Sequence, residues 1–244
     1  MQIVELSHSH AAAAAHLHIA GQPGTFLTSL GADVLTVFYG TLSQSTTGFG
    51  FAALASAATA GTTTEIVISH DTSTKVHSDE TPGVMGFIAA TTSTGHLFFE
   101  LGTRHLAQFL PVLLRQVIKK PGLLWQLIQT LFYPLRGQPN ASAKVAQPAQ
   151  GQRVELLSVM VAPTNRGRGI GAELLQQLMQ ACQVRQISII TVTVAMENHG
   201  ARRFYARHGF VKRHHFELYG RAMCSYQLDL TRHSMSAPTE RNSC

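Results

Sequence analysis

The chain has little charge, little cysteine and almost no tryptophan. Of its 244 residues, 13% are charged, three are cysteine and one is tryptophan. Cys182, Cys224 and Cys244 show no CxxC spacing and no pairing pattern, so nothing indicates a disulfide framework. Such a chain is typical of a reducing compartment, and we expect a cytoplasmic location.

Long apolar runs and basic tracts are also missing. A membrane-spanning helix needs about 20 consecutive apolar residues, and Arg115, Lys119 and Lys120 interrupt the most apolar part of the chain. The alanine-rich segment His8–Ala20 has no basic residues ahead of a sustained apolar run, unlike a signal peptide. No basic run is interleaved with aromatic residues, so we expect no nucleic-acid partner.

The residues that are present suit a globular protein with an anionic ligand. Apolar residues make up 45% of the chain, which is ample for a core, and the net charge is +6. A small anion is enough to account for this charge. His8, His10, His16 and His18 lie close together, but no carboxylate or cysteine completes a ligand set. We therefore expect no metal.

The apolar pattern predicts an α+β fold. Helices are predicted at 8–20, 26–39 and 199–208, the last with Asn198 as its N-cap. Strands are predicted at 1–6, 49–54, 65–69, 83–91, 154–161, 187–194, from 210 onward and at 222–230. We expect a single domain over residues 1–230, with a disordered tail at 231–244.

The pattern over residues 102–150 predicts an insert with two apolar helical faces, separated by Pro121 and Gly122. We favour a helical hairpin that packs on the sheet as an acceptor-site wall or as a dimer interface. The alternative is a helix pair at a membrane surface over 105–136, because basic residues rim the apolar faces.

The stretch 154–179 organises the chain. Val154–Val161 predicts a buried strand, Ala162–Asn165 a turn, and the segment from Arg166 to Gly171 opens a helix with one apolar face. Glycines at the start of a helix leave unpaired amides accessible, and these amides and the positive end of the helix dipole favour an anion. Arg166 and Arg168 add positive charge that suits phosphate.

Several kinds of glycine loop fit this pattern to different degrees. A nucleotide-hydrolase loop needs Gly-Lys-Ser/Thr, which does not occur. Gly167, Gly169 and Ala172 satisfy the dinucleotide fingerprint. The first glycine of that fingerprint should follow the strand at once, however, and here the residues from Pro163 to Arg166 intervene. A plain helix-capping turn with surface arginines is a further alternative.

The order strand, Val-x-Pro, short spacer, Arg-Gly-x-Gly-Ile-Gly and helix resembles the acetyl-CoA signature of the GNAT superfamily of N-acetyltransferases. Glu197-Asn198, Ala201, Phe204-Tyr205 and Gly209-Phe210 resemble the family's second conserved block, so the likeness covers about 154–230. It implies a GNAT fold with a mixed, mostly antiparallel sheet flanked by helices. It also implies transfer of an acetyl group from acetyl-CoA to a primary amine, by direct attack in a ternary complex. We expect the amine to be a small molecule.

The resemblance also implies the residues of the site. The central strand and its neighbour should part where acetyl-CoA enters. The residues expected to bind it are Val159, Met160, Val161, Arg166, Gly167, Arg168, Gly169, Ile170, Gly171, Ala172, Asn198 and Tyr205.

Two residues are candidates for acid–base chemistry. Tyr205 matches the tyrosine that commonly protonates the thiolate in this family; the alternative is a core aromatic. Glu155 lies eleven residues before Arg166, as does the glutamate of the histone-acetylating branch, and we expect it to share a face with Val159 and Val161. The alternatives are a surface residue at a strand end, or a base relayed by water.

One departure and two rival functions accompany this interpretation. Relatives that acetylate protein N-termini carry a glutamate five residues before the asparagine, where this chain has Thr193. A dinucleotide-binding oxidoreductase and a non-catalytic acyl-CoA-binding module are the alternative functions.

Overall fold

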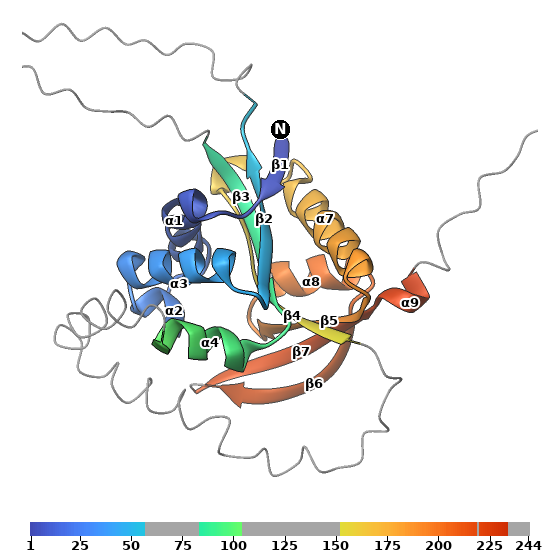
Figure 1. Cartoon of the computed structure of the whole chain (residues 1–244). Helices are drawn as coiled ribbons and strands as arrows, with labels where there is room; N and C mark the ends of the chain where they lie inside the picture. The colour runs from blue at the N-terminus through green and yellow to red at the C-terminus, as the bar shows by residue number, and fades with distance from the viewer. Residues whose placement is uncertain (57–82, 104–151, 219, 234–244) are drawn as a thin grey trace, which may run out of the picture.

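A computed structural model of the chain describes residues 1–56, 83–103, 152–218 and 220–233. A seven-stranded sheet runs through the molecule in the order β1-β2-β3-β4-β5-β7-β6, with helices against both faces (Figure 1). Neighbouring strands are antiparallel except for β4 and β5, which are parallel. The predicted mixed, mostly antiparallel α+β architecture is confirmed.

The strands follow the predicted pattern closely. They are β1 (Gln2–Glu5), β2 (Gly48–Leu54), β3 (Val84–Thr91), β4 (Gln152–Val161), β5 (Ile187–Ala195), β6 (Val211–Leu218) and β7 (Arg221–Asp229). The strand predicted at 65–69 lies outside the described residues. The last strand ends one residue early, because α9 (Leu230–His233) follows it, so the predicted tail begins as a helix.

The helices show two differences from the predicted pattern. They are α1 (Ala11–Gly21), α2 (Phe26–Ser29), α3 (Ala32–Gln44), α4 (Thr94–Thr103), α7 (Ile170–Val184) and α8 (His199–Arg207), with 3-10 turns η1 (His8–His10) and η3 (Pro163–Asn165). The single helix predicted over 26–39 is wrong. Gly31 has a φ of 89°, a left-handed backbone that separates α2 from α3. Helix α4 was not predicted, and residues 104–150 of the insert lie outside the described residues.

Two hydrophobic cores lie on opposite faces of the sheet (Figure 1). On one face α1, α3 and α4 cover β1 to β4, with Leu35, Leu97 and Phe87 fully buried. On the other face α7 packs its apolar stripe, including Leu174 and Leu178, against β2 to β5. The predicted apolar face of the helix after the glycine loop is confirmed.

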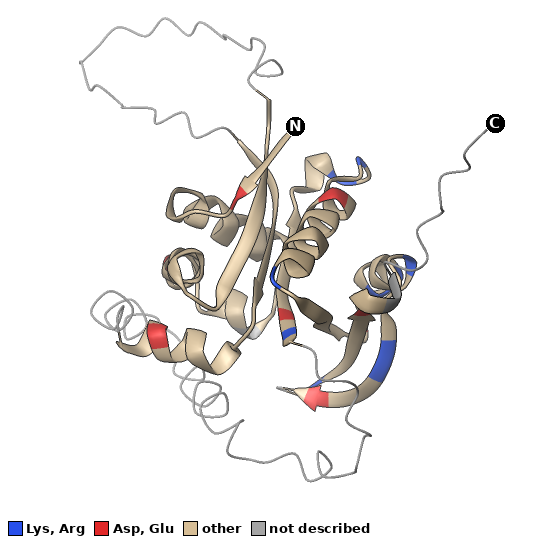
Figure 2. Ribbon diagram, turned by 45° about the vertical axis from the view of Figure 1, so that its right-hand side comes forward, with Lys and Arg blue, Asp and Glu red and all other residues tan. Residues whose placement is uncertain are grey.

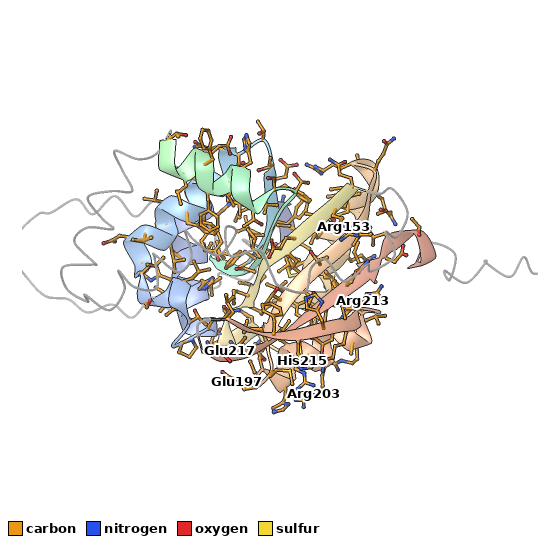
Figure 3. All side chains as sticks on the ribbon, turned by 90° about the horizontal axis from the view of Figure 1, so that it is seen from below. Arg153, Glu197, Arg203, Arg213, His215 and Glu217 are labelled. Carbon is orange, nitrogen blue, oxygen red and sulfur yellow. The ribbon has the colours of Figure 1, made fainter. Side chains whose placement is uncertain are left out.

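The sheet ends in an exposed, charged strand. Residues Val211 to His215 of β6 are all exposed. Seen from below, Arg213, His215 and Glu217 follow this strand along the surface (Figure 3). Charged side chains on an edge strand disfavour pairing with another chain.

Candidate active site

Strands β4 and β5 part within the sheet. Their parallel register runs from Gln152–Ile187 to Leu156–Val192 and stops there. Beyond Leu156, β4 continues to Val161 paired with β3 alone, while β5 continues to Ala195 paired with β7. The two strands therefore open a gap toward the ends from which η3 and α8 lead away.

A bulge in β4 lies at the same point. Ala89 and Ala90 of β3 pair with Ser158 and Leu156, so Leu157 has no partner on β3. An extra residue in one strand reverses the alternation of side chains beyond it. Leu156 accordingly faces the α7 core, and so does Val159, three residues later.

The freed backbone groups of β4 can be assigned from the neighbouring strand. Ala162 donates its amide to the Met85 carbonyl, 2.8 Å away, on the β3 side. Since successive residues of a strand point their backbone groups to opposite sides, Val161 and Val159 turn theirs toward the gap. Met160 turns its backbone toward β3, and its thioether instead packs close to Gly21 of α1.

The glycine loop forms a series of unpaired amides between β4 and α7. Gly167 and Gly169 have φ of 78° and 82°, and an added Cβ at either would meet open space. Within the described chain, the amides from Gly167 to Gly171 have no acceptor. Ala172 differs, because its amide donates to the Gly169 carbonyl at 2.9 Å.

The two loop arginines have different positions. The Arg166 Nε donates to the Val161 carbonyl at 3.3 Å, which places its guanidinium beside the gap. Arg168 is exposed. Most of the described basic side chains belong to the half of the molecule that contains α7, α8 and β6, as Figure 2 shows. Such a field favours an anion at the loop.

Helix α8 begins at the gap. Asn198 is its N-cap, and its Oδ1 accepts from the Ala201 amide at 3.0 Å, as predicted. Tyr205 lies in the same helix, seven residues after Asn198, and is 6% exposed. Its ring packs against Phe210 and Phe204 at 5.2 and 5.3 Å between centroids. Burial raises the pKa of the Tyr205 phenol, so the hydroxyl keeps its proton.

A pocket of about 580 Å³ brings these elements together. Its walls come from β4 (157–161), β5 (192–195), the turn after α1 (21–25) and the start of α8. Of the predicted binding residues, it is lined by Val159, Met160, Val161, Arg166, Gly171, Asn198 and Tyr205. The remaining predicted loop residues lie between Arg166 and Ala172, next to it in the chain.

Glu155 lies elsewhere. It is absent from the pocket lining, and its carboxylate accepts a hydrogen bond from the Thr94 hydroxyl at the start of α4. The expectation that it shares a face with Val159 and Val161 is wrong, because the bulge at Leu157 reverses the alternation between them. Sequence alternation alone could not reveal that bulge.

Several residues of the pocket lining, including the following three, were not predicted as parts of the site. Ser158 lies on β4, Arg221 begins β7, and Gln22 follows α1. Arg221 pairs with Glu197, which lies just before α8. Only Ser158 could have been noticed in the sequence, because it is the one hydroxyl in an otherwise apolar strand segment. Gln22 and Arg221 come to the pocket only through the tertiary fold.

Metal-ligand clusters and membrane-spanning helices can be considered only for the residues that the structure describes. Among the described residues, no group of three or more His, Cys, Asp or Glu side chains is placed to hold a metal ion. No helix in the described ranges has the length and apolarity needed to cross a bilayer.

Known proteins resemble the chain in sequence and in fold. The acetyltransferase (GNAT) family matches residues 124–210. No curated protein matches the chain.

Solved structures share the fold at low identity. NAA60 of Arabidopsis thaliana, in complex with acetyl-CoA, is 13% identical with a TM-score of 0.52, covering 94% of this chain and 98% of that one. The yncA protein of Salmonella typhimurium, with its cofactor acetyl-CoA, is 12% identical with a TM-score of 0.51, covering 100% and 99%. An N-acetyltransferase of Staphylococcus aureus Mu50 is 12% identical with a TM-score of 0.50, covering 94% and 98%.

Proposed function

We propose that the chain is an acetyl-CoA-dependent N-acetyltransferase of the GNAT superfamily, and that its acceptor is the primary amine of a small molecule. The observation that carries this proposal is the parting of β4 and β5 after Leu156–Val192, directly beside the unpaired amides of the glycine loop. One end of the gap suits a diphosphate and the other end suits a thioester. The sheet is not the parallel sheet of a dinucleotide-binding fold, which removes the oxidoreductase alternative.

Each part of the site has a role in direct transfer within a ternary complex. The amides from Gly167 to Gly171, with Arg166, hold the diphosphate. The amides of Val159 and Val161 bond the pantetheine arm and the thioester carbonyl, which favours attack by stabilising the developing oxyanion. Tyr205 donates its phenolic proton to the departing thiolate.

The proton of the attacking amine leaves through water. Glu155 does not serve as the base, because its carboxylate accepts a hydrogen bond from Thr94 and lies outside the pocket lining. The amine is neutral when it attacks the carbonyl carbon. A water molecule takes the proton that the nitrogen loses as the C–N bond forms, and solvent returns a proton to the Tyr205 phenolate.

The small size of the acceptor follows from the room that is left. The pocket of about 580 Å³ must also admit the pantetheine arm, so little volume remains for the amine. Thr193 supports the same conclusion, because it stands at the position where the protein-N-terminus acetylating relatives carry a glutamate. A folded protein surface does not fit such a space.

The test is an acceptor panel with thiol release as the readout. Purified protein with acetyl-CoA should release free CoA thiol when small primary amines are added, and the acetylated amine should appear by mass spectrometry. Acetyl-CoA binding by calorimetry, without release for any amine in the panel, would instead indicate a non-catalytic acyl-CoA-binding module.

A further inference from the structure

A buried polar network lies directly behind the pocket. His18 of α1, Tyr39 of α3 and Ser158 of β4 are 1%, 0% and 4% exposed, on the face of the sheet that α1, α3 and α4 cover. The His18 Nδ1 lies 2.6 Å from the Tyr39 hydroxyl, which lies 2.9 Å from the Ser158 Oγ. Ser158 also lines the pocket, so the network ends at the site.

The direction of the first hydrogen bond follows from its length. An N–H donor normally lies about 2.7 to 3.2 Å from its acceptor, and an O–H donor approaches more closely. The 2.6 Å separation favours the Tyr39 phenol as the donor and the His18 Nδ1 as the acceptor. Burial raises the pKa of Tyr39 and lowers that of His18 to about 4, which keeps the phenol protonated and the imidazole neutral.

The direction of the second hydrogen bond follows from the first. When the Tyr39 hydroxyl donates its hydrogen bond to His18, its oxygen has only lone pairs left for Ser158. Ser158 must then donate to Tyr39, and its own hydrogen is used. Toward the pocket, Ser158 has only lone pairs, so it accepts hydrogen bonds and cannot give one.

The network has a cost that packing does not explain. With Nδ1 as the acceptor, the hydrogen of neutral His18 is on Nε2, and this buried atom has no partner among the described residues. A buried unpaired donor reduces stability, and an apolar side chain here would avoid that. The three residues therefore fix the orientation of a hydroxyl rather than strengthen the core.

We propose that Ser158 is the amine-binding residue of the pocket, and that Tyr39 and His18 are positioning residues that direct its lone pair at an N–H of the acceptor. The inference rests on the proposed function and deepens it, because a hydroxyl that can only accept selects a donor such as an amine. Because Ser158 cannot donate a hydrogen bond toward the pocket, it does not compete with the amides of Val159 and Val161 for the thioester carbonyl.

The test uses methylamine, the smallest primary amine, and follows the release of CoA thiol from acetyl-CoA. For Ser158→Ala the second-order rate constant for methylamine should fall about tenfold to a hundredfold, the range for a lost hydrogen bond to a polar or charged partner. Acetyl-CoA affinity by calorimetry should stay the same. Ser158→Thr, which keeps the hydroxyl, should restore most of the rate.

Matched variants separate positioning from folding. Tyr39→Phe should lower the methylamine rate constant several-fold without changing acetyl-CoA affinity. Thr41→Val removes another buried hydroxyl two residues away on α3, outside the pocket, and should leave both values unchanged. Nitrogen-15 spectra of labelled histidine should show the His18 proton on Nε2.

The outcomes distinguish this inference from the proposed function. A wild-type enzyme that binds acetyl-CoA but releases no thiol with any small primary amine of the panel, methylamine included, overturns both. An unchanged rate constant in Ser158→Ala, or a proton on Nδ1 of His18, overturns the inference alone.

Discussion

Leu156 and Val192 form the last pair of the parallel register between β4 and β5. Beyond them each strand keeps only its antiparallel partner, so β4 remains with β3 and β5 with β7. The sheet thus opens without losing either strand. A ligand that enters there meets the amides of Val159 and Val161 directly.

Gly169 should not tolerate a negative side chain when CoA is bound. Gly169→Asp and Gly169→Asn have the same size and the same strain at a φ of 82°, and they differ only in charge. A carboxylate a few ångströms from the diphosphate should weaken CoA binding by at least about tenfold more than the amide does. Calorimetry measures the affinity, and circular dichroism checks the fold. Equal affinities for the two variants would remove the diphosphate from this loop.

Tyr205→Phe should reduce turnover with little loss of stability. The ring keeps its packing against Phe204 and Phe210, while the proton donor is lost. General acid groups contribute roughly 10²- to 10⁴-fold, so kcat should fall on about that scale, with acetyl-CoA affinity nearly unchanged. Tyr226→Phe is the matched control, since Tyr226 is a neighbouring buried tyrosine 6.5 Å away between centroids. Similar kcat in the two variants would mean that water protonates the thiolate.

Gly171 should accept alanine but not leucine. An added Cβ would lie 3.6 Å from the Phe204 ring and 3.7 Å from Val161, which is ordinary contact. Gly171→Ala should therefore keep acetyl-CoA affinity and increase the free energy of unfolding by up to about 1 kcal/mol. The larger side chain of Gly171→Leu must extend into the pocket, so acetyl-CoA affinity should fall. Calorimetry on both variants checks this, and undiminished affinity for the leucine variant would place the ligand elsewhere.

His18 should make the protein less stable in acid. The unfolded chain takes up a proton at the ordinary pKa of 6.5, whereas burial lowers the folded pKa to about 4. Between these values the unfolded state binds more protons, so the free energy of unfolding falls as the pH falls. The full effect is roughly 3 kcal/mol. Urea unfolding of wild type and His18→Leu at pH 7 and 4.5 isolates this contribution. The same pH dependence in both would contradict the burial of a neutral imidazole.

The sequence determined the elements around the candidate site because they are local. The strand over 154–161, the glycine loop, the helix after it and the Asn198 cap depend on hydrophobic periodicity and on residues that favour particular backbone angles. Those signals lie within a few residues of the structure they specify. The same locality explains why Val159, Val161 and the loop amides could be placed before the fold was known. Gly31 shows where local patterns fail. The helical periodicity of apolar residues continues across it, but its backbone conformation separates α2 from α3.

The tertiary structure decided what lies across from these elements. The bulge at Leu157 depends on pairing with Ala89 and Ala90, and it turned Glu155 toward Thr94 and Val159 toward α7. The hydroxyl of Ser158 acquired a direction only because α1 and α3 bring His18 and Tyr39 against it, across 140 and 119 positions of sequence. Side-chain orientation in a strand depends on register, and hydrogen-bond polarity depends on which partners fold beside it. Both are properties of contacts between distant segments, so no local pattern could contain them.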